Sequence, residues 1–282
     1  MGRFENSIAL AKASWQVLRE DRKLTLLPLL SGITTLLVAL TFLAPIALLA
    51  RDSSGGGYHA GPVDWILGGI GYLVLAYIVI FFNAALVYAA DAHMHGVTVS
   101  IGDALHFAMS RTHVLLPWAI VSATVSIVLR GVRSRGGLLG GIVSAIAGVA
   151  WSLVTFLVLP VLVVEGLGPI KAVKRSGELF KRTWGEQVIA NAGIGLLALG
   201  AILVGALPTA LLVALGGPIA VVGIVAFVLW IVAVSLVTSA LTGILSMALY
   251  RFATDGQVPG FDNDALRGAF RPRNRRGFIG DS

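Results

Sequence analysis

Long uncharged stretches divide this chain, and short charged segments separate them. A helix needs roughly 20 residues to cross the apolar layer of a bilayer, which is about 30 Å thick. The last uncharged stretch, 187–250, is long enough for two such helices, and Gly216-Gly217-Pro218 near its centre is a turn signal. The pattern predicts an all-α, polytopic integral membrane helical bundle. Its six spans lie at about 24–50, 65–90, 114–129, 138–164, 188–215 and 219–250.

The first span follows Arg19, Arg22 and Lys23, which resembles the start of a secretory signal peptide. Its uncharged run, Leu24–Ala50, is much longer than the 7–15 apolar residues that such a peptide carries. We therefore expect this segment to remain in the protein as a span.

Amphipathic segments precede spans one, three and five. In each, apolar residues recur at helical spacing with polar residues beside them, which is typical of helices in the membrane interface. The alternative is that these helices pack under the bundle against other protein. Ser100-x-x-Asp103 before the second segment predicts a capping box. The stripes are Phe4, Ile8, Ala11, Trp15 and Leu18; Ile101, Leu105, Ala108 and Thr112; and Ile170, Val173, Gly177, Phe180 and Trp184.

This order suggests three repeats of an amphipathic helix followed by a two-span hairpin. Ile8, Lys12 and Ser14 match Ile170, Lys174 and Ser176 at one constant offset. The three pairs are a weak internal match, and repeated hairpins occur both in transporters and in proteins that transport nothing.

Lysine and arginine set the orientation. If the N-terminus is cytoplasmic, the cytoplasmic segments hold 17 of these residues and the outer segments hold four. Such a bias is expected from the positive-inside rule. We therefore predict a multi-pass protein of the cell membrane with both termini cytoplasmic, a single membrane domain over 1–250 and a basic cytoplasmic tail over 251–282.

One loop runs against this bias, because Arg130, Arg133 and Arg135 fall outside. Either a short hairpin holds them at the outer headgroups, which we favour, or spans three and four are not both complete.

The composition excludes several classes of protein. Only 12% of the residues are charged and 57% are apolar, which is too little charge for a water-soluble surface. The net charge of +7 is explained by basic residues at the cytoplasmic ends of helices, so we predict no nucleic-acid partner. With no cysteine, the chain has no disulfides, thiol catalysis or iron–sulfur cluster. Five basic residues before span five are predicted to face anionic lipid: Lys171, Lys174, Arg175, Lys181 and Arg182.

Polar residues within the spans are few. Asn83 and Asn191 are the notable amides, and an interhelical hydrogen bond explains each. Gly140, Ser144, Gly148 and Ser152 recur every four residues, a spacing that lets helices pack closely. Ser235, Ser239 and Gly243 repeat the same spacing in span six.

Candidate chemistry is sparse. His93 and His95 are the weak candidates for a metal site, and a polar loop explains them better. The sequence has no P-loop, no Gly-rich nucleotide fingerprint and no recognisable catalytic constellation. We predict no cofactor and no enzymatic activity.

Two segments carry a family resemblance: PVLVVEGLGPIKAVKRSGELFKRTWG from Pro160, and YRFATDGQVPGF from Tyr250. With the opening FENSIALAKASWQVLREDRKLTLLPLLSG, they resemble a family of prokaryotic multi-pass membrane proteins catalogued as a domain of unknown function. The VVEGLGPIKAVKRS stretch is loosely similar to membrane domains fused to glycerophosphodiesterases. The resemblance implies a fold and a membrane location, and it implies no activity.

The sequence thus favours a membrane scaffold that interacts with lipid or with a partner membrane protein. The alternative is a transporter of small solutes or lipids. A continuous polar cavity around Asn83 and Asn191 would favour the transporter, and a dry interior packed on glycine would favour the scaffold.

Overall fold

The computed structural model describes residues 3–21, 23–52, 61–135, 137–184, 193–214, 217–261 and 266. These parts of the chain are helical and contain no strand. The helices are α1 (Arg3–Glu20), α2 (Lys23–Asp52), α3 (Pro62–Met94), α4 (Ile101–Ser110), α5 (Thr112–Arg135), α6 (Gly137–Thr155), α7 (Val158–Val164), α8 (Pro169–Trp184), α9 (Gly193–Ala214) and α10 (Gly217–Asp255).

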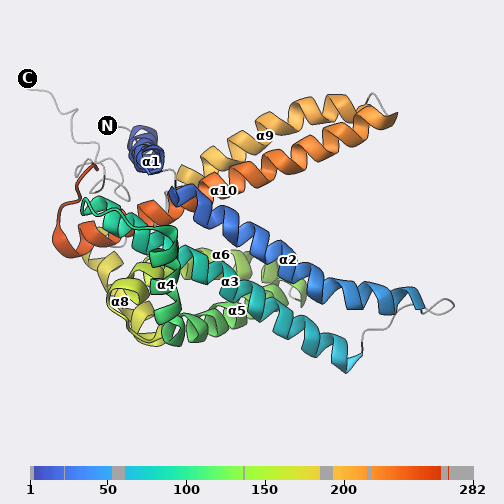
Figure 1. Cartoon of the computed structure of the whole chain (residues 1–282). Helices are drawn as coiled ribbons and strands as arrows, with labels where there is room; N and C mark the ends of the chain where they lie inside the picture. The colour runs from blue at the N-terminus through green and yellow to red at the C-terminus, as the bar shows by residue number, and fades with distance from the viewer. Residues whose placement is uncertain are drawn as a thin grey trace, which may run out of the picture.

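Three helical hairpins diverge from a common end of the molecule (Figure 1). They are formed by α2 with α3, by α5 with α6, and by α9 with α10. The three amphipathic helices α1, α4 and α8 gather at the end where the hairpins meet, which we call the base. The order of one amphipathic helix followed by one hairpin therefore occurs three times, as the sequence predicted.

The hydrophobic core lies at the base, and the hairpin arms beyond it are apolar but exposed. Buried leucines come from the base ends of six helices: Leu18, Leu27, Leu86, Leu115, Leu162 and Leu249. Large apolar side chains cover the arms instead, among them Leu40, Ile70, Ile142, Leu211 and Leu229. Because this much apolar surface is unfavourable in water, the arms require lipid around them.

The packing at the base is cyclic. The last helices of the three hairpin units, α3, α7 and α10, contact one another at the centre. Each amphipathic helix packs beneath the hairpin that precedes it: α4 against α3, and α8 against α6 and α7. The first helix, α1, packs against α9 and α10 and so closes the circle. This arrangement agrees with the predicted threefold repeat.

In the described part of the chain, five helical segments are long and apolar enough to cross a membrane: Lys23–Phe42, Ile66–Met94, Thr112–Ser134, Leu139–Val164 (which spans α6 and α7) and Gly217–Asp255. Where the sequence predicts a span at 188–215, the described residues give a shorter apolar helix, Leu199–Ala214. Residues 185–192 lie outside the description, and Asn191 with them. The all-α membrane bundle is confirmed, with five such helices in the described part of the chain.

The predicted span at 138–164 is not one continuous helix. It breaks between Thr155 and Val158, where α6 ends and α7 begins. Pro160 explains the break, because proline lacks an N–H and its ring clashes with the carbonyl four residues earlier. Ser176 of α8 fills the gap: its hydroxyl donates to the Val154 carbonyl, and the Leu157 N–H donates to it at 3.3 Å.

Span three is longer than the predicted 114–129, since α5 runs from Thr112 to Arg135. Arg130 and Arg133 therefore lie on a helix and not in a loop, and Gly137, with φ of 54°, opens α6 two residues after Arg135. The guanidinium of Arg130 donates to the Tyr72 hydroxyl of α3 and lies 5.0 Å from that ring. Both helices reach span length, which agrees with the short hairpin that we favoured.

The capping box before α4 is confirmed. The Ser100 hydroxyl accepts the Asp103 N–H at 3.1 Å, and the Asp103 carboxylate accepts the Ser100 N–H at 3.2 Å. Hydrogen bonds from the side chain and then the backbone of Ser100 lower the pKa of Asp103. The box fixes where α4 begins, and α4 lies across the base against α3.

The last helix extends past the predicted boundary at residue 250, since α10 continues to Asp255. Gly256, with φ of 79°, ends the helix, as glycine commonly does after a last helical turn. Val258 and Phe261 then return to the core, where they are 3% and 6% exposed. The first part of the predicted tail is therefore part of the folded base, and 262–265 and 267–282 lie outside the description.

Candidate functional site

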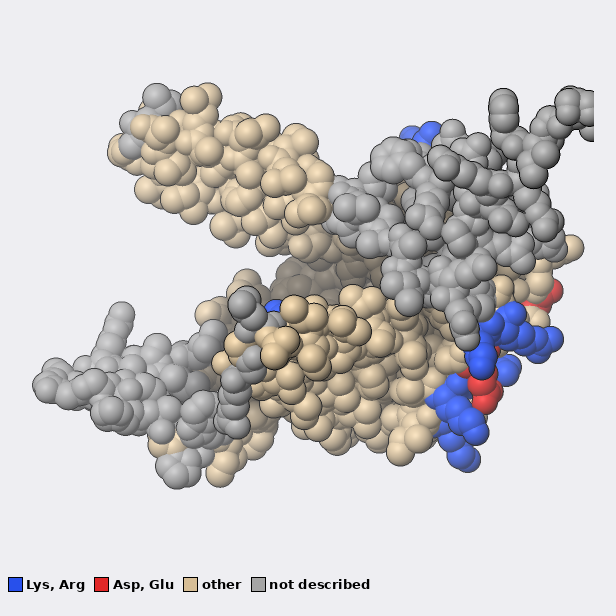
Figure 2. All heavy atoms as spheres, turned by 180° about the vertical axis from the view of Figure 1, so that it is seen from behind, with Lys and Arg blue, Asp and Glu red and all other residues tan. Residues whose placement is uncertain are grey.

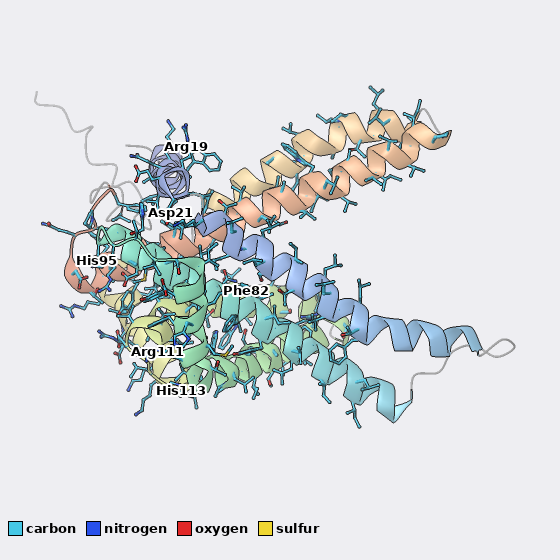
Figure 3. All side chains as sticks on the ribbon, in the orientation of Figure 1. Arg19, Asp21, Phe82, His95, Arg111 and His113 are labelled. Carbon is cyan, nitrogen blue, oxygen red and sulfur yellow. The ribbon has the colours of Figure 1, made fainter. Side chains whose placement is uncertain are left out.

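Charged residues gather at the base, which Figure 2 shows as blue and red patches at one end of the visible face. Among the residues that are coloured on that face, the arms show one small blue spot, in the gap between them. Arg19, Asp21, His95, Arg111 and His113 all lie at the same end in Figure 3. The base is thus the charged, water-facing part of the molecule, in keeping with the charge pattern of the sequence.

An ion pair joins α3 to α10 at the base. Arg251 donates from Nε to Asp91 Oδ1 and from Nη2 to Asp91 Oδ2, each at 2.7 Å. The two side chains are only 21% and 17% exposed. A bidentate pair of this kind fixes both distance and orientation, so it holds the base ends of two hairpins together.

A second polar link joins α7, α8 and α10. The Glu165 carboxylate, directly after α7, accepts hydrogen bonds from the Tyr250 hydroxyl and from Arg175 Nε, each at 3.0 Å. Tyr250 precedes Arg251, so the two adjacent residues of α10 bind the other two central helices. These contacts are structural, because each of these side chains is hydrogen-bonded to another side chain of the same link.

Arg175 is therefore a correction to the predicted lipid-facing set. The other four, Lys171, Lys174, Lys181 and Arg182, are exposed and share one face of α8. The opposite face is buried against the bundle through Ala172, Ser176, Leu179 and Phe180. The predicted stripe is displaced, since Ile170 is 81% exposed. The packed alternative thus holds for the apolar side of α8, while its other side is exposed among the described residues and carries Glu178 as well as these four cations.

His93 and His95 do not face each other. His93 Nε2 lies 3.4 Å from Glu20 of α1, and His95 Nδ1, just after α3, lies 2.7 Å from the Asp91 carbonyl of that helix. Asp91 is already occupied by Arg251. In the described residues, no three His, Cys, Asp or Glu side chains come together as a metal site would need.

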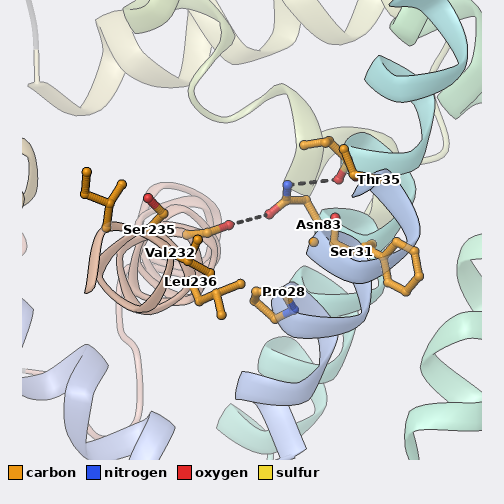
Figure 4. A pocket seen from close by; sticks show the side chains of 12 residues that line it. Pro28, Ser31, Thr35, Asn83, Val232, Ser235 and Leu236 are labelled. Carbon is orange, nitrogen blue, oxygen red and sulfur yellow. Dashed lines mark hydrogen bonds between the residues drawn. The ribbon is translucent and has the colours of Figure 1, made fainter. Parts of the chain in front are cut away.

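Asn83 lies between two pockets. Its Nδ2 donates to the Val79 carbonyl of α3, and Ser239 of α10 donates to its Oδ1 at 3.5 Å. The predicted interhelical hydrogen bond is present but long. Figure 4 shows the first pocket, between α2, α3 and α10, with a volume of about 330 Å³. Its polar lining comprises Ser31, Thr35, Asn83, Ser235 and Ser239.

The second pocket lies on the other side of the Asn83–Ser239 contact, between α3, α5, α6, α7 and α10. It also measures about 330 Å³, and its lining includes Trp118 and Phe156. Its polar lining adds Thr155, Thr238, Thr242 and Ser246 to Asn83 and Ser239. The hydroxyl groups on α10 recur three or four residues apart, so they form one polar stripe that passes from pocket to pocket.

The sequence did not identify these pockets. The spacing of Ser235 and Ser239 predicts close helix packing, and both line a pocket instead. Gly243, in the same set, does pack closely: a Cβ there would lie 2.7 Å from Leu86 Cδ2. The sequence signal for these pockets is the high density of Ser and Thr residues along α10. Whether such residues pack against a helix or line a pocket depends on which helix lies opposite them.

The small residues that recur every four positions on α6 also differ in their surroundings. A Cβ on Gly140 would lie 2.6 Å from the Val132 carbonyl oxygen of α5, and Ser144 donates to the Leu129 carbonyl at 2.9 Å. A Cβ on Gly148 would have nothing within 4 Å, and exposed Ser152 donates within its own helix, to Val149. Among the described residues, close packing is thus seen at Gly140 and Ser144 and not at Gly148 and Ser152.

Comparison with known families decides where the chain belongs. The model of the family of unknown function DUF6159 matches residues 66–261, which is more than half of the chain. The chain belongs to this family. No match was found among curated proteins or among solved structures. The resemblance to a family catalogued as a domain of unknown function is thereby confirmed, and the looser likeness to glycerophosphodiesterase-associated domains is not shown.

The region that matches DUF6159 contains both links at the base, from Asp91 to Arg251 and from Glu165 to Arg175 and Tyr250. It also contains Asn83 and Ser239, the residues shared by the two pockets. The helices α1 and α2 precede it. The features that join the three hairpins thus belong mainly to the DUF6159 part of the chain.

Proposed function

We propose that this protein is a non-enzymatic scaffold of the cell membrane that binds anionic lipid through α8. The observation that carries the proposal is the division of α8 into two faces. Lys171, Lys174, Lys181 and Arg182 are exposed together, while the opposite face is buried beneath the bundle. A helix held in this way presents its cations as a fixed row at the level of the lipid headgroups.

The energetics of such a row suit a lipid partner. Each cation near an anionic membrane surface contributes about 1 kcal/mol. Salt screens this attraction over about 10 Å at 0.1 M. Four cations on a rigid support would therefore select anionic lipid strongly at low salt and weakly at high salt.

Replacing these four residues by glutamine is expected to abolish lipid selectivity. The measurement is the association of spin-labelled phosphatidylglycerol and phosphatidylcholine with the full chain in mixed bilayers, at low and high salt. We expect the wild-type protein to prefer phosphatidylglycerol several-fold at low salt, and the variant to bind both lipids equally.

The matched control is Arg133→Gln, which removes one exposed cation from the far end of α5. It should leave the selectivity nearly unchanged. A quadruple variant that keeps the wild-type preference would contradict the proposal, and it would point to a protein partner or to other basic residues.

The orientation proposed here places the base and both termini in the cytoplasm. The chain has no cysteine, so single introduced cysteines report accessibility without background. We expect Ser282→Cys to react with an impermeant thiol reagent only from the cytoplasmic side, and Ser53→Cys only from outside. A C-terminus that is labelled from outside would overturn the orientation.

Transport of a small solute or lipid is the second candidate. It is favoured by the two hydroxyl-lined pockets that meet at Asn83 and Ser239. The scarcity of ionisable groups within the described spans argues against coupling to an ion gradient. A cysteine at Thr242 that reacts from both sides of the membrane would favour transport, whereas one that reacts from neither side would favour the scaffold.

A further inference from the structure

The pocket between α2, α3 and α10 is lined by polar groups, although it lies among helices whose other surfaces are apolar. Asn83 precedes Asp91, the charged residue of α3 at the base, by eight residues, or about 12 Å at 1.5 Å per residue. Since the apolar layer of a bilayer is about 30 Å thick, this distance puts Asn83 within it. Polar atoms in this layer have few water partners, so they gain from a ligand that supplies hydrogen bonds.

Some of these polar atoms have no partner within the described residues. Thr35 Oγ1 is buried without a hydrogen bond. The contact between Ser239 and Asn83 Oδ1, at 3.5 Å, is longer than a good hydrogen bond. The pocket therefore offers a donor and acceptors that are only partly used, on three different helices.

The pocket also restricts the charge of its occupant. Among the described residues, no Lys, Arg, Asp or Glu lines either pocket. An ionised headgroup at this depth would be costly because it would find no counter-charge. The chemistry therefore fits a neutral ligand with hydroxyl or carbonyl groups.

The surroundings of the pocket define the rest of that ligand. Pro28, Val232 and Leu236 lie in its wall (Figure 4), and Leu36 of α2 and Leu229 of α10 are exposed on the arms beyond it. The arms diverge there, and a deep hollow separates the lobes in Figure 2. An acyl chain attached to a polar group in the pocket would lie along these apolar arms.

We propose that the pocket between α2, α3 and α10 binds one neutral glyceride lipid, with its hydroxyl and ester groups at Thr35, Asn83 and Ser239. The volume of about 330 Å³ lies at the lower end of the range for ligand sites, which suits a polar glycerol unit whose chains remain outside. This site is independent of the basic face of α8, because it contains no charge.

The experiment uses the full chain in phosphatidylcholine nanodiscs and a diacylglycerol probe with a photoactivatable diazirine in one acyl chain. A phosphatidylcholine probe with the same chain reports ordinary annular lipid. We expect the diacylglycerol probe to label peptides of α2 and α10 around the pocket. Unlabelled dioleoylglycerol should displace it, and free glycerol should not, which separates a lipid from a water-soluble polyol.

Thr35→Val is the decisive variant. Valine has the shape of threonine without the hydroxyl, and Thr35 Oγ1 has no partner to lose among the described residues. Folding should therefore be unaffected or slightly improved, while glyceride labelling should fall about two- to tenfold, the value of one hydrogen bond. Asn83→Leu should reduce the labelling further.

The matched control is Ser152→Leu, which changes an exposed hydroxyl on α6 that bonds only within its own helix. It should leave the labelling at wild-type strength. Equal labelling of the pocket by both probes would overturn the proposal, as would a Thr35→Val protein with unchanged labelling.

Discussion

Replacing Asp91 by alanine is expected to lower the free energy of unfolding by about 3 kcal/mol. The Arg251 side chain is only 21% exposed in the intact pair, and the substitution removes its bidentate partner on α3. Removal of one member of a buried pair costs roughly 3–5 kcal/mol, and the partial exposure here puts the effect at the lower end. The measurement is the midpoint of SDS-induced unfolding of the full chain from mixed micelles.

Two further variants test whether the pair itself is responsible. The exchange Asp91→Arg with Arg251→Asp should recover part of the lost stability, because opposite charges again face each other across α3 and α10. Asp255 carries the other carboxylate near Arg251; its side chain is 50% exposed, and its Oδ2 lies 3.4 Å from Arg251 Nη1. Asp255→Asn should therefore change stability by less than about 1 kcal/mol. If Asp91→Ala is as mild as Asp255→Asn, the link does not hold the base together.

Gly140→Leu is expected to separate α5 from α6 and to destabilise the protein by about 1–3 kcal/mol. Any side chain at this position meets the Val132 carbonyl oxygen, since a Cβ would lie 2.6 Å from it. That atom belongs to the backbone, so it moves only if the helix moves. The hydrogen bond from Ser144 to Leu129 would be lost in the same displacement. Loss of stability in the same SDS titration checks this prediction.

Gly148→Leu is the matched control for that substitution. It lies on the same helix at the same four-residue spacing, but a Cβ there has open space around it. We expect little loss of stability. Strong destabilisation by Gly148→Leu would mean that another molecule, such as a second copy of the chain, covers this face.

Much of the architecture was predictable from local patterns. Uncharged runs of span length predicted the hairpins, and amphipathic spacing predicted α1, α4 and α8. Both signals are local, because the bilayer thickness and the helical period act on neighbouring residues. The capping box of Ser100 and Asp103 is local for the same reason.

Where the sequence failed, the deciding partner lay far away in the chain. Arg175 has the same sequence pattern as its basic neighbours on α8, and only the position of Glu165 separates it from them. Pro160 within an apolar stretch is compatible with a kinked span, and the buried hydroxyl of Ser176 stabilises the gap that forms there.

The sequence by itself determined that this protein is a helical membrane bundle with a basic end, because lipid demands apolar length and the membrane surface attracts cations. The tertiary structure alone decided how the repeated units use their polar residues. Ser144 packs against α5 while Ser152 bonds within its own helix, and Ser239 lines both pockets while Gly243 lies close to Leu86 and lines only the second pocket. The physical reason is that small residues at a period of four define a helix face, and the neighbour that meets this face is set by the packing of the three hairpins at the base.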